Sequence, residues 1–243
     1  MDDYNAFAAD YNEFEEEAVT LWRLGYPVVT GLLGNLKGKS VLDYGCGTGI
    51  FSRFLESKGA RVTGVDVSER MIEVAKNSGK DTIEYHTISS AGIGFLSDET
   101  FDFVVSNFVF CTIQTRGEIS LILQQIFRVL KKEGIFIFMN SNWDKSNGKE
   151  FVSFRLDFCS NLVSGQPVMA VIKSDPPIVL HDFYWPVDDY REMLEGTGFR
   201  VRDYREMKAG SDDVSWRDEK DFPPYYVIVA GKFEIASSLR SSQ

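Results

Sequence analysis

Cysteine and histidine are scarce in this sequence. Its 243 residues include three cysteines and two histidines. Cys46, Cys111 and Cys159 form no C-x-x-C pair and their number is odd, so neither a disulfide framework nor a zinc site is indicated. No apolar run approaches the roughly 18 residues of a membrane-spanning helix, and the first residues are acidic rather than basic. We therefore expect a cytoplasmic protein without a bound metal.

Basic residues are also in deficit. The chain has 26 Lys and Arg against 36 Asp and Glu, a net charge of −10. Because affinity for DNA or RNA depends on neutralising phosphates, this balance argues against bulk nucleic-acid binding. Hydrophobic residues make up 44% of the chain and can supply a sizeable core. The length fits one α/β domain, and the oligomeric state is left open.

Three glycines at every second position follow a short apolar stretch. Ser40–Tyr44 is expected to form a buried strand, Gly45, Gly47 and Gly49 a turn, and Ile50–Lys58 an amphipathic helix. Glycine allows a positive φ and leaves no Cβ between the main chain and a ligand. A strand, glycine turn and helix in this order place a small molecule over the end of the strand, against the helix N-terminus.

A nicotinamide dinucleotide site is the first alternative to test. Its G-x-G-x-x-G fingerprint requires a third glycine where this chain has Ile50. The pattern here begins instead with an acid, Asp43, two residues before the first glycine. A second strand, Arg61–Val65, ends in Asp66, whose carboxylate can accept two hydrogen bonds from a ribose diol. The pattern therefore suits a nucleoside whose appended group is not a pyrophosphate.

Four segments together resemble a known family. Val41–Gly49, Val62–Ser68, Phe101–Asn107 and Arg128–Gly134 are similar, in order and spacing, to the class I (Rossmann-like) S-adenosylmethionine (SAM)-dependent methyltransferases, in particular their small-molecule branch. The resemblance is close over residues 39–140 and looser towards the end of the chain. It implies SAM as cofactor and S-adenosylhomocysteine (SAH) as product.

The resemblance also implies roles for individual residues. Asp43 and the main chain of the glycine turn would hold the methionine part of SAM, and Asp66 its ribose. Val67 and Met71 would pack on the adenine. The full implied set is Tyr11, Asp43, Gly45, Cys46, Gly47, Gly49, Asp66, Val67, Met71, Ser89, Ser90, Asn107 and Phe108.

Two pairs of residues in this set lie at or just after the ends of expected strands. Asn107 and Phe108, at the end of the fourth strand, would flank the donor and face the substrate. Ser89 and Ser90 stand where many relatives have an acid followed by alanine, the acid accepting the adenine amino group. Serine can accept that hydrogen bond too, although backbone groups are the alternative.

We expect an α/β fold with a seven-stranded, doubly wound, mostly parallel sheet whose last strand is antiparallel. The strands are expected at 40–44, 61–65, 82–87, 101–109, 135–139, 199–204 and 225–232. The expected divisions of this single domain are an N-terminal helical lid (1–38), a SAM-binding core (39–140), a substrate-recognition insertion (141–197), a C-terminal strand pair (198–233) and a tail (234–243).

The N-terminal segment has two interpretations. Tyr4, Phe7 and Tyr11 recur at helical spacing and share one face. They belong either to helices packed on the sheet edge or to a lid whose aromatic residues contact the sulfonium cation.

Within the insertion, Ser141–Leu180 is the least family-like part of the chain, and a helix is expected over Glu150–Val163. Segments that follow the carboxyl ends of parallel strands line the ligand crevice, so we expect substrate recognition here. Its aromatic and amide side chains predict a small, flat, partly apolar substrate, with burial in the core as the alternative for each. The candidate substrate contacts are Asn140, Trp143, Phe154, Tyr184 and Trp185.

A general base is harder to place. His86 lies within the third expected strand and is interpreted as structural. His181 precedes Asp182 in the insertion, and a histidine pKa near 6.5 suits proton abstraction at neutral pH. His181 is therefore the candidate catalytic base and Tyr184 the second candidate. A packing or surface role is the alternative for His181.

These patterns predict methyl transfer to an N or O atom of a small molecule. A SAM-binding protein that does not methylate, or one that activates a partner subunit, is an alternative from a different class. A methyltransferase acting on RNA or protein is another. Asp175–Ile178 and Phe222–Tyr225 resemble the D/N-P-P-Y loop of amino-methylating enzymes, but that loop must follow the fourth strand, where Asn107–Phe110 stands instead.

Overall fold

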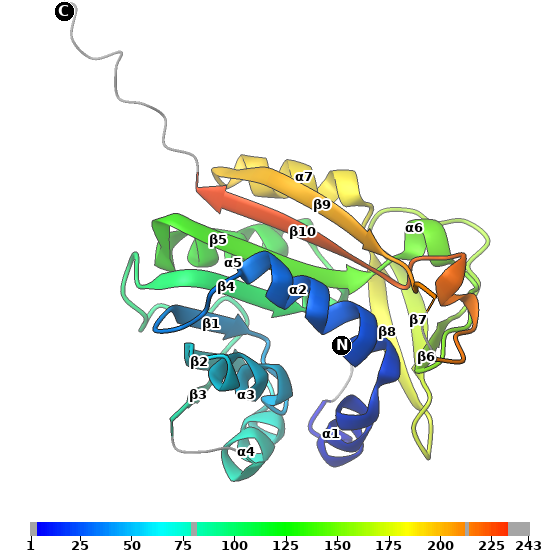
Figure 1. Cartoon of the computed structure of the whole chain (residues 1–243). Coiled ribbons are helices and arrows are strands. Elements are labelled where there is room, and N and C mark those ends of the chain that lie inside the picture. The colour runs from blue at the N-terminus through cyan, green and yellow to red at the C-terminus, as the bar shows by residue number, and fades with distance from the viewer. Residues whose placement is uncertain (1–3, 79–81, 212–213, 233–243) are drawn as a thin grey trace, which may run out of the picture.

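Seven strands form one sheet at the centre of the computed structural model, which describes residues 4–78, 82–211 and 214–232 (Figure 1). The strand order is β3-β2-β1-β4-β5-β10-β9, and β10 is antiparallel to both of its neighbours while β1 to β5 pair in parallel. The predicted fold class is confirmed. The strands are β1 (Ser40–Tyr44), β2 (Arg61–Asp66), β3 (Glu84–Thr87), β4 (Phe101–Asn107), β5 (Leu130–Ser141), β9 (Phe199–Met207) and β10 (Tyr225–Lys232).

The strand order reverses beside β1. The chain runs outward from β1 through β2 to β3 and then returns to place β4 on the other side of β1. Tyr44 at the end of β1 pairs with Val65, next to the last residue of β2. Because parallel strands end at the same edge, this reversal opens a crevice beyond the carboxyl ends of β1, β2 and β4.

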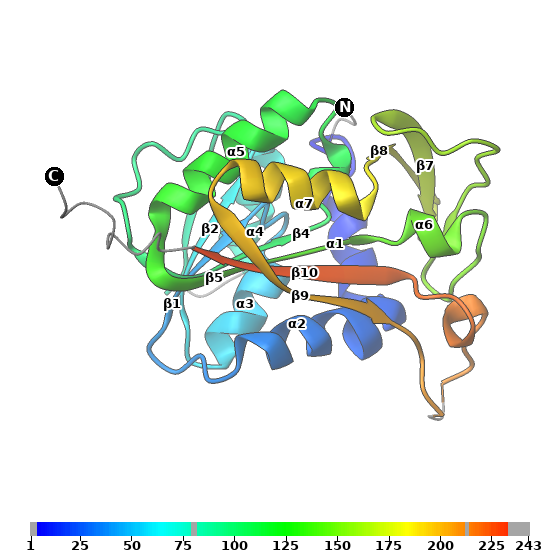
Figure 2. The same ribbon diagram turned by 90° about the horizontal axis from the view of Figure 1, so that it is seen from above.

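Helices cover both faces of the sheet. Alternation along the strands sends Val41 and Val105 into one apolar cluster and Leu42 and Val104 into the other. Figure 2 shows α2 and α3 on one face and α5 and α7 on the opposite face. The helices are α1 (Ala8–Glu17), α2 (Tyr26–Leu33), α3 (Ile50–Ser57), α4 (Glu69–Ser78), α5 (Arg116–Val129), α6 (Trp143–Ser146) and α7 (Val187–Gly196), with short π or 3₁₀ turns η1 (Leu21–Gly25), η2 (Phe110–Thr112) and η3 (Asp218–Lys220).

The insertion after β5 contains a second, antiparallel sheet of three strands, in the order β6-β7-β8. These are β6 (Phe154–Leu156), β7 (Gln166–Ile172) and β8 (Ile178–Tyr184). The helix predicted over Glu150–Val163 is therefore wrong. Phe154 and Leu156 are buried while Arg155 between them is exposed, a period of two that pairing with β7 stabilises.

Several strand boundaries also differ from the prediction: β3 begins at Glu84 rather than at 82, β5 ends at Ser141 rather than at 139, and β9 ends at Met207 rather than at 204. β4 ends at Asn107 rather than at Val109, because Phe108 adopts a left-handed backbone with φ +57. β5 begins at Leu130 because α5 runs directly into it. The expected tail, 234–243, lies outside the described residues, and the proposed division into lid, core and insertion stays a prediction. Within the described ranges, no helix is both long and apolar enough to cross a membrane.

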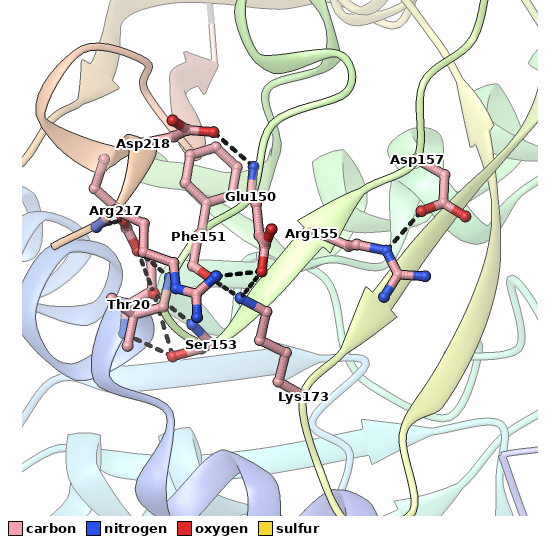
Figure 3. A network of polar contacts seen from close by, with 11 residues as sticks. Thr20, Glu150, Phe151, Ser153, Arg155, Asp157, Lys173, Arg217 and Asp218 are labelled. Atoms are coloured by element: carbon pink, nitrogen blue, oxygen red, sulfur yellow. Dashed lines mark hydrogen bonds and ion pairs between the residues drawn. The ribbon is translucent and has the colours of Figure 1, made fainter.

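A buried carboxylate joins three distant segments. Glu219, in η3 of the β9–β10 connection, is fully buried and accepts hydrogen bonds from the Thr20 hydroxyl (3.1 Å), the Val152 amide (2.6 Å) and the Arg217 amide (2.9 Å). Thr20 also donates from its amide to the Ser153 hydroxyl (3.1 Å). Figure 3 shows the contacts among the labelled members of this network, which hold the insertion against the N-terminal segment.

We predict that Glu219→Ala lowers the free energy of unfolding by about 3–5 kcal/mol, because one buried and two partly buried donors lose a buried, charged acceptor. Denaturant unfolding measures this. Glu195→Ala, an exposed glutamate of α7, is the control and should change stability by less than about 0.5 kcal/mol. Equal stability of the two variants would contradict the assignment.

A second buried acid anchors α1. Glu15 accepts a short hydrogen bond from the Tyr26 hydroxyl, and its backbone carbonyl accepts one from the Trp22 indole (2.9 Å). Burial raises the pKa of Glu15 from 4.5 to about 7; the Asp43 charge also raises it, while the Tyr26 hydrogen bond opposes the rise. A raised carboxyl pKa means that the folded state favours the protonated acid. Its stabilising effect is therefore complete below pH 4.5 and is lost as the pH rises to about 7.

We predict that Glu15→Gln reduces the fall in unfolding free energy between pH 4.5 and pH 8 by on the order of 3 kcal/mol, since each pKa unit corresponds to about 1.4 kcal/mol. Urea unfolding across this pH range measures the effect. Glu16→Gln, at the exposed neighbouring position, should leave the wild-type pH dependence in place. The same slope in all three proteins would contradict the prediction.

Candidate active site

A cavity of about 340 Å³ lies beyond the carboxyl ends of β1, β2 and β4. Its walls come from the N-terminal segment, from the ends of these strands and from the inner face of the three-stranded sheet. Most residues of the implied cofactor set line it, namely Tyr11, Gly45, Gly47, Asp66, Val67, Met71, Ser90, Asn107 and Phe108. Asp43, Cys46, Gly49 and Ser89 do not.

Gly45 and Gly47 of the glycine turn are required for different reasons. A Cβ on Gly45 would stand 2.0 Å from a methyl group of Val109, so packing of the loop after β4 requires glycine there. At Gly47, φ is +53 and no heavy atom lies within 4 Å of the position that a Cβ would take. Gly47 therefore offers bare main chain to the cavity, as a closely approaching ligand needs.

Asp66 connects this turn to the end of β2. Its carboxylate accepts hydrogen bonds from the Gly47 amide (2.9 Å) and from the Ser68 amide (2.9 Å). Burial raises the pKa of Asp66, and these amide hydrogen bonds oppose the rise. Asp66 thus lies at the cavity wall with its carboxylate held in place by main-chain donors.

Three members of the implied set have structural roles in the turn or next to it. Asp43 is buried and accepts a hydrogen bond from the Ser52 hydroxyl (2.6 Å) of α3, and burial raises its pKa to about 7. Cys46 is buried with its sulfur beside Gly64. Gly49 is the N-cap residue of α3, with φ +77. In this structure the three support the turn and do not line the cavity.

The β2 end of the cavity is apolar with one polar corner. Val67, Met71 and Ile88 supply its apolar wall. The Ser90 hydroxyl donates to a carboxylate oxygen of Glu118 (2.5 Å), in the first turn of α5. Glu118 lines the cavity but was missed by the sequence analysis, because nothing local relates α5 to the loop after β3.

At the end of β4, one residue has a strained backbone and another has a hydrogen-bond acceptor without a partner among the described residues. Phe108 has a left-handed backbone, a conformation that is costly outside glycine and that often marks functional sites. Its ring packs against Tyr225 with centroids 5.1 Å apart. The buried Oδ1 atom of Asn107 has no hydrogen-bond partner within the described part of the chain. A ligand donor in the cavity would satisfy it.

The three-stranded sheet supplies the opposite wall, through Phe154, Ala170, Ile172, Leu180 and Asp182. Phe154 stacks on Tyr225 with centroids 5.2 Å apart and an angle of 6° between the rings. Asp182 is 4% exposed and is the carboxylate that this sheet contributes to the lining. This half of the cavity is therefore mostly apolar.

Of the candidate substrate contacts, Phe154 lines the cavity and the others do not. The Asn140 amide donates to the Tyr190 hydroxyl (3.1 Å), and the Trp185 indole donates to the Ile113 carbonyl (2.9 Å). Trp143 is buried in the core, and the Tyr184 hydroxyl donates to Asp144. For these four residues the geometry matches the alternative interpretation, burial in the core.

The two candidate bases are also outside the cavity lining. His181 is exposed, because β-strand alternation places it on the face of β8 opposite to its neighbour Asp182. Tyr184 lies at the end of β8. A catalytic role for either gains no support from this arrangement, and the carboxylate that β8 contributes to the cavity lining is that of Asp182. Recognising 178–184 as a strand, with Leu180 and Asp182 on one face, would have found it.

The N-terminal segment covers the cavity with aromatic side chains. Tyr4, Tyr11 and Phe14 line it, and the Tyr11 ring lies 6.4 Å from that of Tyr4 and 6.1 Å from that of Phe14. Burial raises the pKa of the Tyr11 hydroxyl, so it stays protonated. The position agrees with the lid interpretation, and its opening and closing stay a prediction.

Comparison with known proteins identifies the family. A family model described as a methyltransferase domain matches residues 42–138. The chain is similar to N-demethylindolmycin N-methyltransferase of Streptomyces griseus, with 30% identity over 79% of this chain and 84% of that protein. This chain belongs to the SAM-dependent methyltransferases.

Two further similarities agree with this identification. Demethylmenaquinone methyltransferase of Tropheryma whipplei (strain Twist) is 28% identical over 74% of each chain. The crystal structure of a SAM-dependent methyltransferase from Mesorhizobium loti shares the fold, with a TM-score of 0.62, 20% identity and coverage of 84% of this chain and 95% of that one. The methyl donor of this methyltransferase is SAM.

The cavity of the methyltransferase fits such a donor. Gly47 leaves the main chain open, and the Oδ1 atom of Asn107 needs a donor. Val67, Met71 and Ile88 form an apolar wall suited to a purine ring. These features come from the ends of β1, β2, β3 and β4, which the sheet brings to one edge.

We predict that Gly47→Ala weakens SAM binding at least tenfold while costing only about 1–2 kcal/mol of stability, since the added methyl group enters open space at a positive φ. Gly45→Ala should lower stability by a further 1–3 kcal/mol or so, because its methyl group overlaps Val109. Calorimetric titration and denaturant unfolding measure both quantities. Unchanged SAM affinity in a folded Gly47→Ala protein would contradict the role of Gly47.

Proposed function

We propose that this methyltransferase transfers a methyl group from SAM to an N or O atom of a small, mostly apolar molecule. The observation that carries this proposal is one continuous cavity, which extends from the glycine turn to the apolar inner face of the three-stranded sheet. The names of both relatives above describe methylation of small molecules, which supports this substrate class.

The proposed cofactor contacts follow from the placement of the side chains. The main chain of Gly45 and Gly47 would face the methionine part of SAM, and Asp66 would accept hydrogen bonds from the ribose hydroxyls. Val67 and Met71 would pack on the adenine. In this arrangement Asp43 would support the turn without touching SAM, since its carboxylate accepts a hydrogen bond from α3 and does not line the cavity.

When bound, SAM supplies a methyl group on a positively charged sulfur to an acceptor placed in line with the carbon–sulfur bond. The protein's own task is alignment and exclusion of water, and alignment alone can contribute effective molarities of about 10⁵–10⁸ M. Phe108, Phe154 and Tyr225 form a packed aromatic wall that would position a flat substrate. Tyr11 and Phe14 would cover the reacting groups.

Two observations bear on the alternatives. The net charge of −10 disfavours an RNA substrate. A partner subunit that binds SAM but has no substrate of its own would have no need of an apolar substrate half continuous with the cofactor half. An activating subunit would be recognised by SAM binding without SAH release against any small molecule.

The proposal is tested by calorimetric titration with SAM, SAH and NAD, followed by SAH release from SAM against a library of small molecules. We expect SAM and SAH to bind, NAD not to bind, and at least one apolar acceptor to give SAH. SAM binding without turnover across the library would favour the non-methylating alternative.

We further predict that Asp66→Asn weakens SAM binding at least tenfold, because a hydrogen bond to a charged group contributes about 1.5–3 kcal/mol. Asp203→Asn is the matched control: Asp203 lies on β9 and is paired with Arg205, away from the cavity. Equal affinity for SAM in the two variants would show that Asp66 does not hold the ribose.

A further inference from the structure

The charge of the cavity wall has one sign. Among the described residues that line the cavity, Asp66, Glu118 and Asp182 carry a carboxylate, and none is a lysine, arginine or histidine. Asp66 and Glu118 lie at the end occupied by the glycine turn and Ser90, where main-chain amides and the Ser90 hydroxyl donate to them. Asp182 is the carboxylate of the substrate half.

Asp182 lies on an apolar surface. It projects from the inner face of β8, pairs in register with Val168 of β7, and shares the cavity wall with Leu180 and Ala170. At 4% exposure, its carboxylate is removed from bulk water. A charge in such surroundings interacts with a ligand much more strongly than a charge at the protein surface does.

Asp182 also lies close to the end of β4. β8 packs against η2, which begins three residues after Asn107. Burial raises the pKa of the Cys111 thiol in η2, and the charge and hydrogen bonding of Asp182 raise it further. Burial also raises the pKa of Tyr11, and the charges of Asp182 and Asp66 add to that rise. Tyr11, Asp66 and Asp182 all line the cavity, and the packing of β8 on η2 brings Asp182 towards the end of β4.

The cavity lining accordingly offers hydrogen-bond acceptors to a ligand. Asp182 is an acceptor when ionised, and the Oδ1 atom of Asn107 is an acceptor without a partner among the described residues. A carboxylate or phenolate acceptor must be an anion to act as a nucleophile, and a second negative charge beside a buried carboxylate is strongly disfavoured. An amine brings N–H donors and a neutral or positive charge.

We propose that the methyl acceptor is the nitrogen of an amine on an apolar, aromatic-sized skeleton, and that Asp182 binds its N–H group and receives its proton. This inference rests on the proposed function. In the reaction, the nitrogen lone pair forms the bond to the methyl carbon, and the electrons of the broken carbon–sulfur bond stay on sulfur. The nitrogen loses one proton, which passes to a carboxylate oxygen of Asp182.

The test uses matched probes on the full chain saturated with SAH. The probes are 2-phenylethylamine, 2-phenylethanol and phenylacetate, together with the naphthyl amine, alcohol and acid of the same chain length. Calorimetric titration compares the wild type with Asp182→Asn and with Asp157→Asn. Asp157 is the control, because its carboxylate pairs with Arg155 of β6 and does not line the cavity.

We expect at least one amine to bind the wild type tenfold or more tightly than its alcohol, and the acids not to bind. Asp182→Asn should reduce this preference to less than twofold while SAH affinity stays within twofold of the wild type. Asp157→Asn should keep the preference. Retained SAH binding together with an unchanged melting temperature shows that Asp182→Asn is folded, and Asp182→Glu provides a second variant that keeps the charge.

Three results would overturn the proposal: alcohols or acids binding as well as amines, an amine preference that survives in Asp182→Asn, or no binding of any amine to a protein that binds SAH. Each leaves the proposed function standing, because SAH binding is measured in the same samples. Failure of the wild type to bind both SAM and SAH would instead remove the proposed function itself.

Discussion

The parallel pairing of β1 with β2 and with β4 is the constraint on which the site depends. It brings the glycine turn, Asp66 and Asn107 to one edge of the sheet although they are distant in sequence. The Gly47 amide then reaches the Asp66 carboxylate directly. Without this register, the turn would present its open main chain to a surface that lacks the acid and the acceptor beside it.

The insertion converts this edge into an enclosed site. Its three strands place an apolar face opposite the strand ends, and α1 covers the remaining side with aromatic rings. The Glu219 network ties the insertion to the N-terminal segment and to the β9–β10 connection. The proposed substrate half is thus assembled from parts of the chain that lie outside the core sheet, and the core sheet sets where they meet.

Much of the fold and of the cofactor half could be predicted from the sequence, because the signals there are local. The apolar run 40–44, the glycines after it and the acid at 66 each indicate a strand that ends at a turn. The substrate half could not be predicted in the same way. Phe154 was identified by its residue type. Asp182 was missed because the direction of its side chain depends on the pairing of β8 with β7, which the sequence around Asp182 does not reveal. Asp182 is the direct neighbour of His181, which is exposed.

The most direct test of this account is a crystal structure of the protein with SAH bound. We predict that the ribose hydroxyls lie within hydrogen-bond distance of Asp66, that the homocysteine part lies along Gly45 and Gly47, and that the sulfur points towards Asn107 and the inner face of β8. An SAH molecule bound elsewhere, or bound with its ribose away from Asp66, would contradict the account.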